Sequence, residues 1–430
     1  MSAIFVSAGA LALLAASQPG TDTLPERADL ALSSSPQQAA TPTVALAPAT
    51  APQDDWTIVW KWKDGVRFET ANGQVKGRML GRIQWDASWL DLDDSLQAAG
   101  FTDADGTEFR RARLGVSFEL FDGYEVMAEY DFVAQDVQIK DLYVGKKDLL
   151  GPVDVRAGHY KEPFSIGQLT SDSYTTFVER ALPDAFAPAR NSGVQFSSSH
   201  AGDAINWAIG GFKDTDDGGI NQEDGGYAVT GRVSGSPIYN NEGATVVHVG
   251  ASYTQRDESD LRYRQRPELH LSDFLVDTGT LDTDDVGVAN LELTTALGPV
   301  HGTAEYMTAS AGGNDDIDAD GFYVEAGWLI TGEHRPYRRS AGVWDRLIPT
   351  ENAGGGGTGA WEVAARFSTI DLTDGAVVGG EEDNITVAVN WYLNPNMRWG
   401  VDYIMGNVDL GPGLDDEDLS ALVTRIEANW

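Results

Sequence analysis

The sequence predicts an all-β protein, a membrane-spanning antiparallel β-barrel of about 16 strands with short turns at one rim and longer acidic loops at the other. Apolar and polar residues alternate with a period of two through most of the chain after residue 56. Many of these runs reach the ~9–11 residues that a tilted strand needs to cross a bilayer. Short turns such as 121–123 are followed by long acidic stretches such as 312–321. Together these features favour a barrel.

Two segments precede the alternating region. Residues 1–17 hold an apolar core followed by small residues, which predicts an export signal peptide. The alternative is an apolar helix at the start of a soluble domain. Residues 18–54 are rich in Ala, Pro, Thr and Ser and predict a flexible tether. The barrel is therefore expected over residues 55–430.

The strands are expected wherever the alternation is continuous. In the stretch NPNMRWGVDYIMG, Met397, Trp399 and Tyr403 share an apolar face, whereas Arg398 and Asp402 share the opposite face. The other runs repeat this separation. The predicted strands are 77–90, 107–121, 123–133, 137–146, 152–159, 192–200, 203–213, 226–235, 244–256, 260–270, 286–297, 299–310, 319–332, 358–371, 382–393, 396–409 and 417–430.

A soluble β-sandwich or a solenoid would also alternate, but sandwich strands are usually shorter, at about 5–6 residues. The final run favours the barrel. Leu422, Thr424, Ile426 and Ala428 share one face with the aromatic carboxy-terminal Trp430. This ending resembles the assembly signal of outer-membrane barrels, so the expected location is the bacterial outer membrane.

Composition excludes several function classes. The chain has 66 acidic and 30 basic side chains, a formal net charge of -36, which argues against nucleic acid as a partner. It has no cysteine, and therefore no disulfide or thiolate metal site. Asp316, Asp318 and Asp320 mimic the start of an EF-hand loop, but Gly327 stands at its twelfth position. With no catalytic, phosphate-binding or metal motif in the sequence, we expect no enzyme, no cofactor and no metal.

Arginines are concentrated at the start of one predicted strand, in GTEFRRARLGV. Alternation turns Arg111 and Arg113 toward the water-filled interior and Leu114 toward lipid. Arg110 falls in the outward phase. Because a lysine or arginine facing lipid at mid-membrane costs ~2–4 kcal/mol, Arg110 is expected at the rim or in a bulge.

Other arginines continue this row. They are expected to share polar faces at Arg78, Arg82, Arg262, Arg264 and Arg266. Rows of inward guanidinium groups make a path for anions, because each group stays charged and offers bidentate hydrogen bonds to an oxyanion. In the alternative interpretation the arginines pair with interior carboxylates such as Glu129 and Asp131 and only stiffen the wall.

A family resemblance adds to this pattern. EFRRARLGV, AGHYKEPFS, YTTFVERAL, LITGEHRPY, GAWEVAARFSTIDL and NWYLNPNMRWGVDY occur in the order seen in the phosphate-selective porins O and P. The resemblance spans Gly77 to Trp430 and implies a homotrimer of 16-stranded barrels that passes phosphate-like anions. It implies ladder or constriction positions at Arg82, Arg110 and Arg111 and external ladder positions at Arg264 and Arg266, with Lys161 of HYKEPF nearby.

The chain also departs from the family pattern. Gln168 stands where a constriction lysine is expected, and Glu268 and Ser272 stand where the next two ladder arginines are expected. Losing cationic sites weakens the field that selects phosphate.

The expected function is a passive channel for small anions, phosphate or polyphosphate foremost, through an arginine-lined interior. Outer-membrane lipid and these anions are the expected partners. The alternative is a non-selective or weakly cation-preferring general porin. Two other classes stay open: a lipid hydrolase with a serine and a histidine on the outer wall, and an adhesin or structural barrel with a plugged interior.

Overall fold

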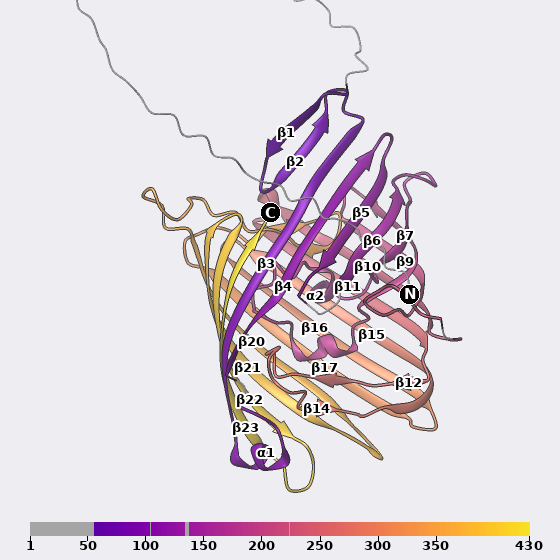
Figure 1. The fold of residues 1–430 in the computed structure, drawn as a ribbon, viewed down its shortest axis with the longest axis vertical. Coiled ribbons are helices and arrows are strands. Elements are labelled where there is room, and N and C mark those ends of the chain that lie inside the picture. The colour runs from indigo at the N-terminus through magenta and orange to yellow at the C-terminus, as the bar shows by residue number, and fades with distance from the viewer. Residues whose placement is uncertain (1–55, 104, 134–136, 223) are drawn as a thin grey trace, which may run out of the picture. The chain divides into compact units, whose positions relative to one another are not determined.

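The computed structural model describes residues 56–103, 105–133, 137–222 and 224–430. Within these residues, 16 strands form a closed antiparallel barrel, because the last strand pairs with the first (Figure 1). The barrel strands are β3 (Val75–Leu92), β4 (Gly106–Leu120), β5 (Tyr124–Asp131), β6 (Gln138–Lys146), β7 (Asp154–Lys161), β8 (Arg190–His200), β9 (Ile205–Lys213), β10 (Tyr227–Asn240), β11 (Thr245–Asp257), β15 (Leu281–Leu297), β16 (Val300–Gly313), β17 (Ile317–Leu329), β20 (Ala360–Asp374), β21 (Val377–Asn394), β22 (Met397–Asp409) and β23 (Glu417–Asn429). The predicted fold class is confirmed. The signal peptide and tether predicted over 1–17 and 18–54 lie outside the described residues.

Alternation along the strands sorts side chains between the outer wall and the interior, as predicted. On β22, Met397 and Trp399 are exposed on the outer wall, whereas Arg398 and Asp402 are buried inside. Membrane barrels carry such an outward apolar band above a polar interior. The polar groups of alternate residues are thus brought together inside the barrel.

The predicted strand at 260–270 is wrong. That stretch belongs to a loop, here called the 258–280 loop, which contains β12 (Asp260–Leu261), β13 (Arg264–Gln265) and β14 (Val276–Asp277). Its apolar residues, such as Leu261 and Leu269, are buried in an interior cluster, while Arg262 and Arg264 are exposed. A period of two therefore indicates only an extended segment whose two faces differ. Such segments also occur outside membrane-spanning strands.

Two further segments lie between barrel strands. The constriction loop, residues 162–189, connects β7 to β8 and contains α2 (Ile166–Leu169) and η1 (Leu182–Phe186); Figure 1 shows α2 across the barrel interior. The 330–359 segment connects β17 to β20 on the rim that otherwise has short turns, and contains β18 (Tyr337–Arg338) and β19 (Val343–Trp344). The alternation pattern did not predict this segment. The remaining short helices are α1 (Asp94–Ala99) and η2 (Asn241–Gly243).

An apolar cluster fills part of the interior toward the long-loop rim. Leu182 and Phe186 of the constriction loop and Leu275 of the 258–280 loop pack there against wall residues such as Ile370 and Leu419. Close packing of these side chains excludes water from that part of the cross-section. Polar groups of the interior therefore gather beside and below this cluster.

A small hairpin extends β3 at the short-turn rim. It consists of β1 (Ile58–Trp62) and β2 (Val66–Thr70). The closing strand β23 pairs with β3 only as far as Arg82, and β2 takes over from Arg78 to Lys76 (Figure 1). In this register Arg67 lies opposite Arg78, which places two guanidinium groups on neighbouring strands.

Candidate anion path

The constriction loop is held at its start by one wall carboxyl group. Glu305 on β16 accepts hydrogen bonds from the backbone N–H of Ile166 at 3.0 Å and of Gly167 at 2.9 Å, and from Ser165 Oγ at 3.0 Å. The wall residues Asn290 and Tyr323 donate to the same carboxyl group. Five donors thus converge on Glu305, and three of them come from the loop.

The middle of the loop is held through its backbone carbonyl groups. Side chains of the wall and of the 330–359 segment donate to five of them: Arg335 to Tyr174 O, Arg398 to Thr175 O, Asn390 to Thr176 O, Arg425 to Val178 O and Arg366 to Glu179 O. Four of these five donors are arginines that the sequence did not single out as functional. For Arg366, Arg398 and Arg425 the signal was their inward phase on β20, β22 and β23, whereas Arg335 lies on the 330–359 segment, where no alternation marks it.

Three of the predicted site residues meet at Asp172 of the constriction loop. Arg82 Nη1 lies 3.1 Å, Arg113 Nη1 3.0 Å and Arg111 Nε 3.3 Å from Asp172 Oδ2. Arg180 of the loop pairs with Oδ1 of the same carboxylate. Arg113 is also paired with Asp131 at 2.7 Å. The inward direction predicted for Arg82, Arg111 and Arg113 is observed, with carboxylates already beside them.

Arg110 lies in a β-bulge. Gln84 pairs with Arg111 and Trp85 with Phe109, so Arg110 is the extra residue on β4. The bulge turns its side chain inward, where it makes a bidentate ion pair with Glu179 of the constriction loop at 2.9 and 3.1 Å. This agrees with the expectation from the cost of an arginine in lipid.

The buried Arg425 on β23 also contacts Glu179, at 2.8 Å, and it pairs with Asp86 on β3. With Arg111 at 3.9 Å, Glu179 therefore shares three arginines, and Asp172 shares four. The two loop carboxylates neutralise much of the arginine cluster at the constriction.

Arg264 and Arg266 lie apart from this group, on the 258–280 loop. Their guanidinium carbons lie 4.1 and 3.9 Å from the ring centre of Phe274, and neither side chain has an ion-pair partner among the described residues. Burial and the charges of Arg110 and Arg264 lower the pKa of Arg266. The two arginines therefore form a separate cationic patch on the long-loop side.

The residues that depart from the family pattern are held in the structure rather than left facing water. Glu268 is buried and pairs with Arg366 of the wall. Ser272 accepts a hydrogen bond from Arg266 through its backbone carbonyl. Lys161, at the end of β7, donates from Nζ to the backbone carbonyl of Gln168 at 2.5 Å. Lys161 thus fastens the start of the constriction loop.

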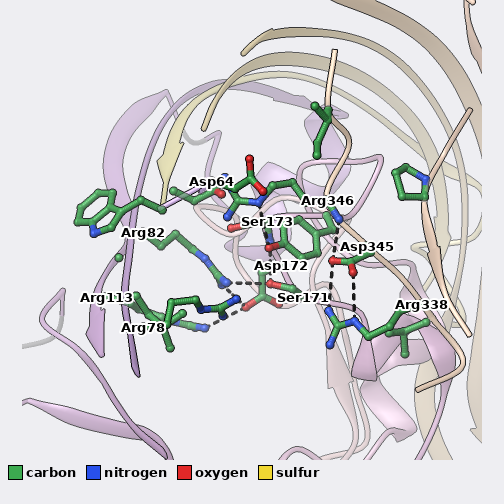
Figure 2. Close-up of a pocket in the computed structure, with 18 of the residues that line it drawn as sticks. Asp64, Arg78, Arg82, Arg113, Ser171, Asp172, Ser173, Arg338, Asp345 and Arg346 are labelled. Carbon is green, nitrogen blue, oxygen red and sulfur yellow. Dashed lines mark hydrogen bonds and ion pairs between the residues drawn. The ribbon is translucent and has the colours of Figure 1, made fainter. Parts of the chain in front are cut away.

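A cavity of about 950 Å³ opens below the constriction, toward the short-turn rim (Figure 2). We call it the vestibule. Its basic lining residues are Arg67, Arg78, Arg82, Arg113, Lys161, Arg190, Arg338 and Arg346, and its acidic ones are Asp64, Glu129, Asp141, Asp172, Glu333 and Asp345. Basic side chains thus outnumber acidic ones in this lining, although the whole chain has more than twice as many acidic as basic side chains.

Three vestibule arginines have no carboxylate partner among the described residues. Arg67 donates to the backbone carbonyl of Lys63, Arg346 donates to that of Pro395, and Arg78 has no hydrogen-bond or ion-pair partner within the described part of the chain. Figure 2 shows Arg78 beside Arg82 and Arg113, with the Arg338–Asp345 pair across the cavity.

The two loop carboxylates are strongly acidic. Burial opposes the ionisation of Asp172, but Arg111 and Arg180 outweigh it and hold the pKa of this carboxyl well below its usual range. Burial likewise opposes the ionisation of Glu179, and Arg110 and Arg425 hold its pKa well below the usual range. Both groups are therefore anions at neutral pH.

No helix among the described residues is long and apolar enough to cross a bilayer. The same residues contain no group of three or more His, Cys, Asp or Glu side chains placed to hold a metal ion.

Comparison with known proteins assigns the chain to a family. The family model for phosphate-selective porins O and P matches residues 78–428. A Caulobacter vibrioides protein is 30% identical over 406 residues, covering 89% of this chain and 78% of its own length. Porin O of Pseudomonas aeruginosa is 26% identical over 422 residues, covering 88% of this chain and 94% of its own.

Solved structures share the fold. An anion-selective porin from Comamonas acidovorans superposes with a TM-score of 0.53 at 13% identity and covers 83% of this chain and 100% of its own. OmpF of Salmonella typhi superposes with a TM-score of 0.52 at 13% identity and covers 86% of this chain and 100% of its own. The chain is thus a β-barrel of the bacterial outer membrane, and it belongs to the family of phosphate-selective porins O and P.

Proposed function

We propose that the protein is a passive diffusion channel for small anions, phosphate among them, and that it carries out no covalent chemistry. The observation that carries this proposal is the vestibule, where Arg67, Arg78 and Arg346 face water without a carboxylate partner among the described residues. Membership of a porin family supports a channel over a lipid hydrolase.

The electrostatic potential along this path depends on where the charged side chains lie. Charges exposed on the outer loops are screened beyond ~8–10 Å at physiological salt, so the net charge of -36 does not set the potential inside the barrel. Unpaired guanidinium groups in a confined cavity raise the local concentration of anions. Arg264 and Arg266 supply a second such patch on the long-loop side. An anion would therefore meet unpaired cations before and after the constriction.

A general porin of low selectivity is the second candidate, and the constriction itself favours it. Asp172 and Glu179 pair with the arginines that would otherwise attract anions most strongly. The two candidates differ in the sign and size of ion selectivity.

The reversal potential of the purified protein in a planar bilayer, measured across a potassium chloride gradient, separates the candidates. We expect anion preference for the native channel and a reduced preference for Arg78→Ala. Arg262→Ala is the matched control, because it removes the same charge from an exposed pair with Asp277 outside the vestibule. Cation preference of the native channel would refute the proposal.

We also propose that three copies assemble in the outer membrane. One structural neighbour, OmpT of Vibrio cholerae, is described in a trimer form, with a TM-score of 0.52 at 11% identity. Light scattering of the detergent-solubilised protein is expected to give the mass of three chains. The mass of one chain would contradict the assembly.

A further inference from the structure

The carboxylate of Asp172 is surrounded by four guanidinium groups, those of Arg82, Arg111, Arg113 and Arg180. Its side chain is only 6% exposed and lies at the inner end of the vestibule (Figure 2). Arg82, Arg111 and Arg113 approach a single oxygen atom of this group within 3.3 Å. Two barrel strands thus aim three guanidinium groups at one point in space.

Part of the donor capacity of this cluster is unused. Within the described residues, Arg82 Nε is buried and has no hydrogen-bond partner, and Arg111 Nε lies 3.3 Å from Asp172 Oδ2 without the geometry of a hydrogen bond. A buried donor without an acceptor is costly. A planar carboxylate presents only two oxygens to the cluster, and Arg180 already occupies one of them. An oxyanion with three or four oxygens would offer acceptors to more of these donors. The cluster is therefore better matched to a tetrahedral oxyanion than to the carboxylate that fills it.

The constriction loop is also fastened on both sides of Asp172. Glu305 holds the loop before it, at Ile166 and Gly167. Arg335 and Asn390 hold the loop after it, at the carbonyl groups of Tyr174 and Thr176. Neutralising residue 172 should therefore leave the loop in place while it frees the guanidinium groups.

We propose that Asp172 is a tethered competitor that occupies an oxyanion site formed by Arg82, Arg111 and Arg113. The ligand class of this site is a small tetrahedral oxyanion, such as phosphate or sulfate. The inference rests on the proposed function, because it takes the anion path as given. In the native protein the side chain keeps the site filled, so anions pass without being retained. Residue 172 thereby sets the preference between tetrahedral oxyanions and chloride.

The test uses the full chain with Asp172→Ala, which opens the site, and Asp172→Asn, which removes the charge but keeps the volume. Asp345→Asn is the matched control, because it removes one negative charge from the same vestibule away from Asp172. Chloride current through single channels is measured while inorganic phosphate is added. We expect the half-blocking phosphate concentration to fall at least about tenfold in Asp172→Ala, as follows from removing a competing charge a few ångströms away. A smaller fall is expected in Asp172→Asn. Asp345→Asn frees Arg338 in the vestibule but leaves the site at Asp172 filled, so its fall should be smaller still.

Thermal unfolding with and without phosphate provides a second readout. Phosphate is expected to raise the melting temperature of Asp172→Ala more than that of the native protein. The inference is overturned if Asp172→Ala and Asp345→Asn respond alike to phosphate in the current measurement. If Asp172→Ala fails to fold, an Asp172→Asn channel that phosphate blocks no better than Asp345→Asn overturns it as well. Cation preference of the native channel would refute the proposed function alone, because the freed site would still bind phosphate in Asp172→Ala.

Discussion

Replacing Glu305 with alanine is expected to release the start of the constriction loop. The carboxyl group accepts three hydrogen bonds from the loop, at 2.9–3.0 Å. A hydrogen bond contributes a net ~1 kcal/mol, so losing three of them weakens the docked position by about 3 kcal/mol. A change of about 3 kcal/mol raises the population of undocked loops by about 100-fold. Glu305→Ala channels should therefore fluctuate between conductance levels that the native channel rarely visits.

Single-channel recording in a planar bilayer measures this effect. Glu382→Ala is the control. Glu382 is equally buried in the wall, but it accepts its hydrogen bond from Asn384 on its own strand and none from the described residues of the loop. We expect larger mean conductance and greater current noise in Glu305→Ala, and a native record in Glu382→Ala. Equal, quiet records from both variants would show that the carbonyl contacts alone hold the loop, and would refute the role given to Glu305.

Three other outcomes are expected. Arg425→Met leaves Asp86 buried without its partner and should lower the free energy of unfolding in urea by about 3–5 kcal/mol, whereas the exposed Arg262→Met should not change it. The double variant Arg264→Ala/Arg266→Ala should weaken phosphate block from the long-loop side only; equal weakening from both sides would contradict a separate patch. Finally, although burial opposes ionisation, guanidinium groups keep the pKa values of the two constriction-loop carboxylates low, so both stay ionised from about pH 7 to about pH 5. Their stabilising pairs weaken only below the unfolded-state pKa of about 4. A difference in reversal potential between the native channel and Asp172→Asn that changes between pH 7 and 5 would contradict this assignment.

Much of the barrel could be predicted because alternation is a local property of the chain. The bulge at Arg110 followed from its outward phase and the cost of a cation in lipid. The 258–280 loop was mistaken for a strand because Arg264 and Leu261 alternate there for a different reason, the packing of one face on an interior cluster. The 330–359 segment has no alternation to reveal it.

Only half of the candidate site, the arginines, could be predicted from the sequence. Alternation gives the direction of Arg82, Arg111 and Arg113, but it does not say what lies opposite them. Asp172 and Glu179 come from a loop about 60 to 90 residues away in sequence, and only the folded chain brings them to the arginines. The alternative interpretation, in which carboxylates pair with the arginines, named only wall residues. Asp131 and Glu129 do pair with Arg113, but the loop carboxylates Asp172 and Glu179 were not foreseen.

The backbone attachments of the constriction loop affect how the solute preference of such channels can change during evolution. Five attachments hold backbone carbonyl oxygens, which every amino acid possesses, so these contacts do not depend on which side chains stand at those positions. Replacing a loop side chain that is neither packed nor paired therefore alters the chemistry of the barrel interior while these backbone attachments remain. A bacterium confronted with a new nutrient could acquire a differently tuned entry route through single codon changes in this stretch, while the surrounding wall is inherited intact.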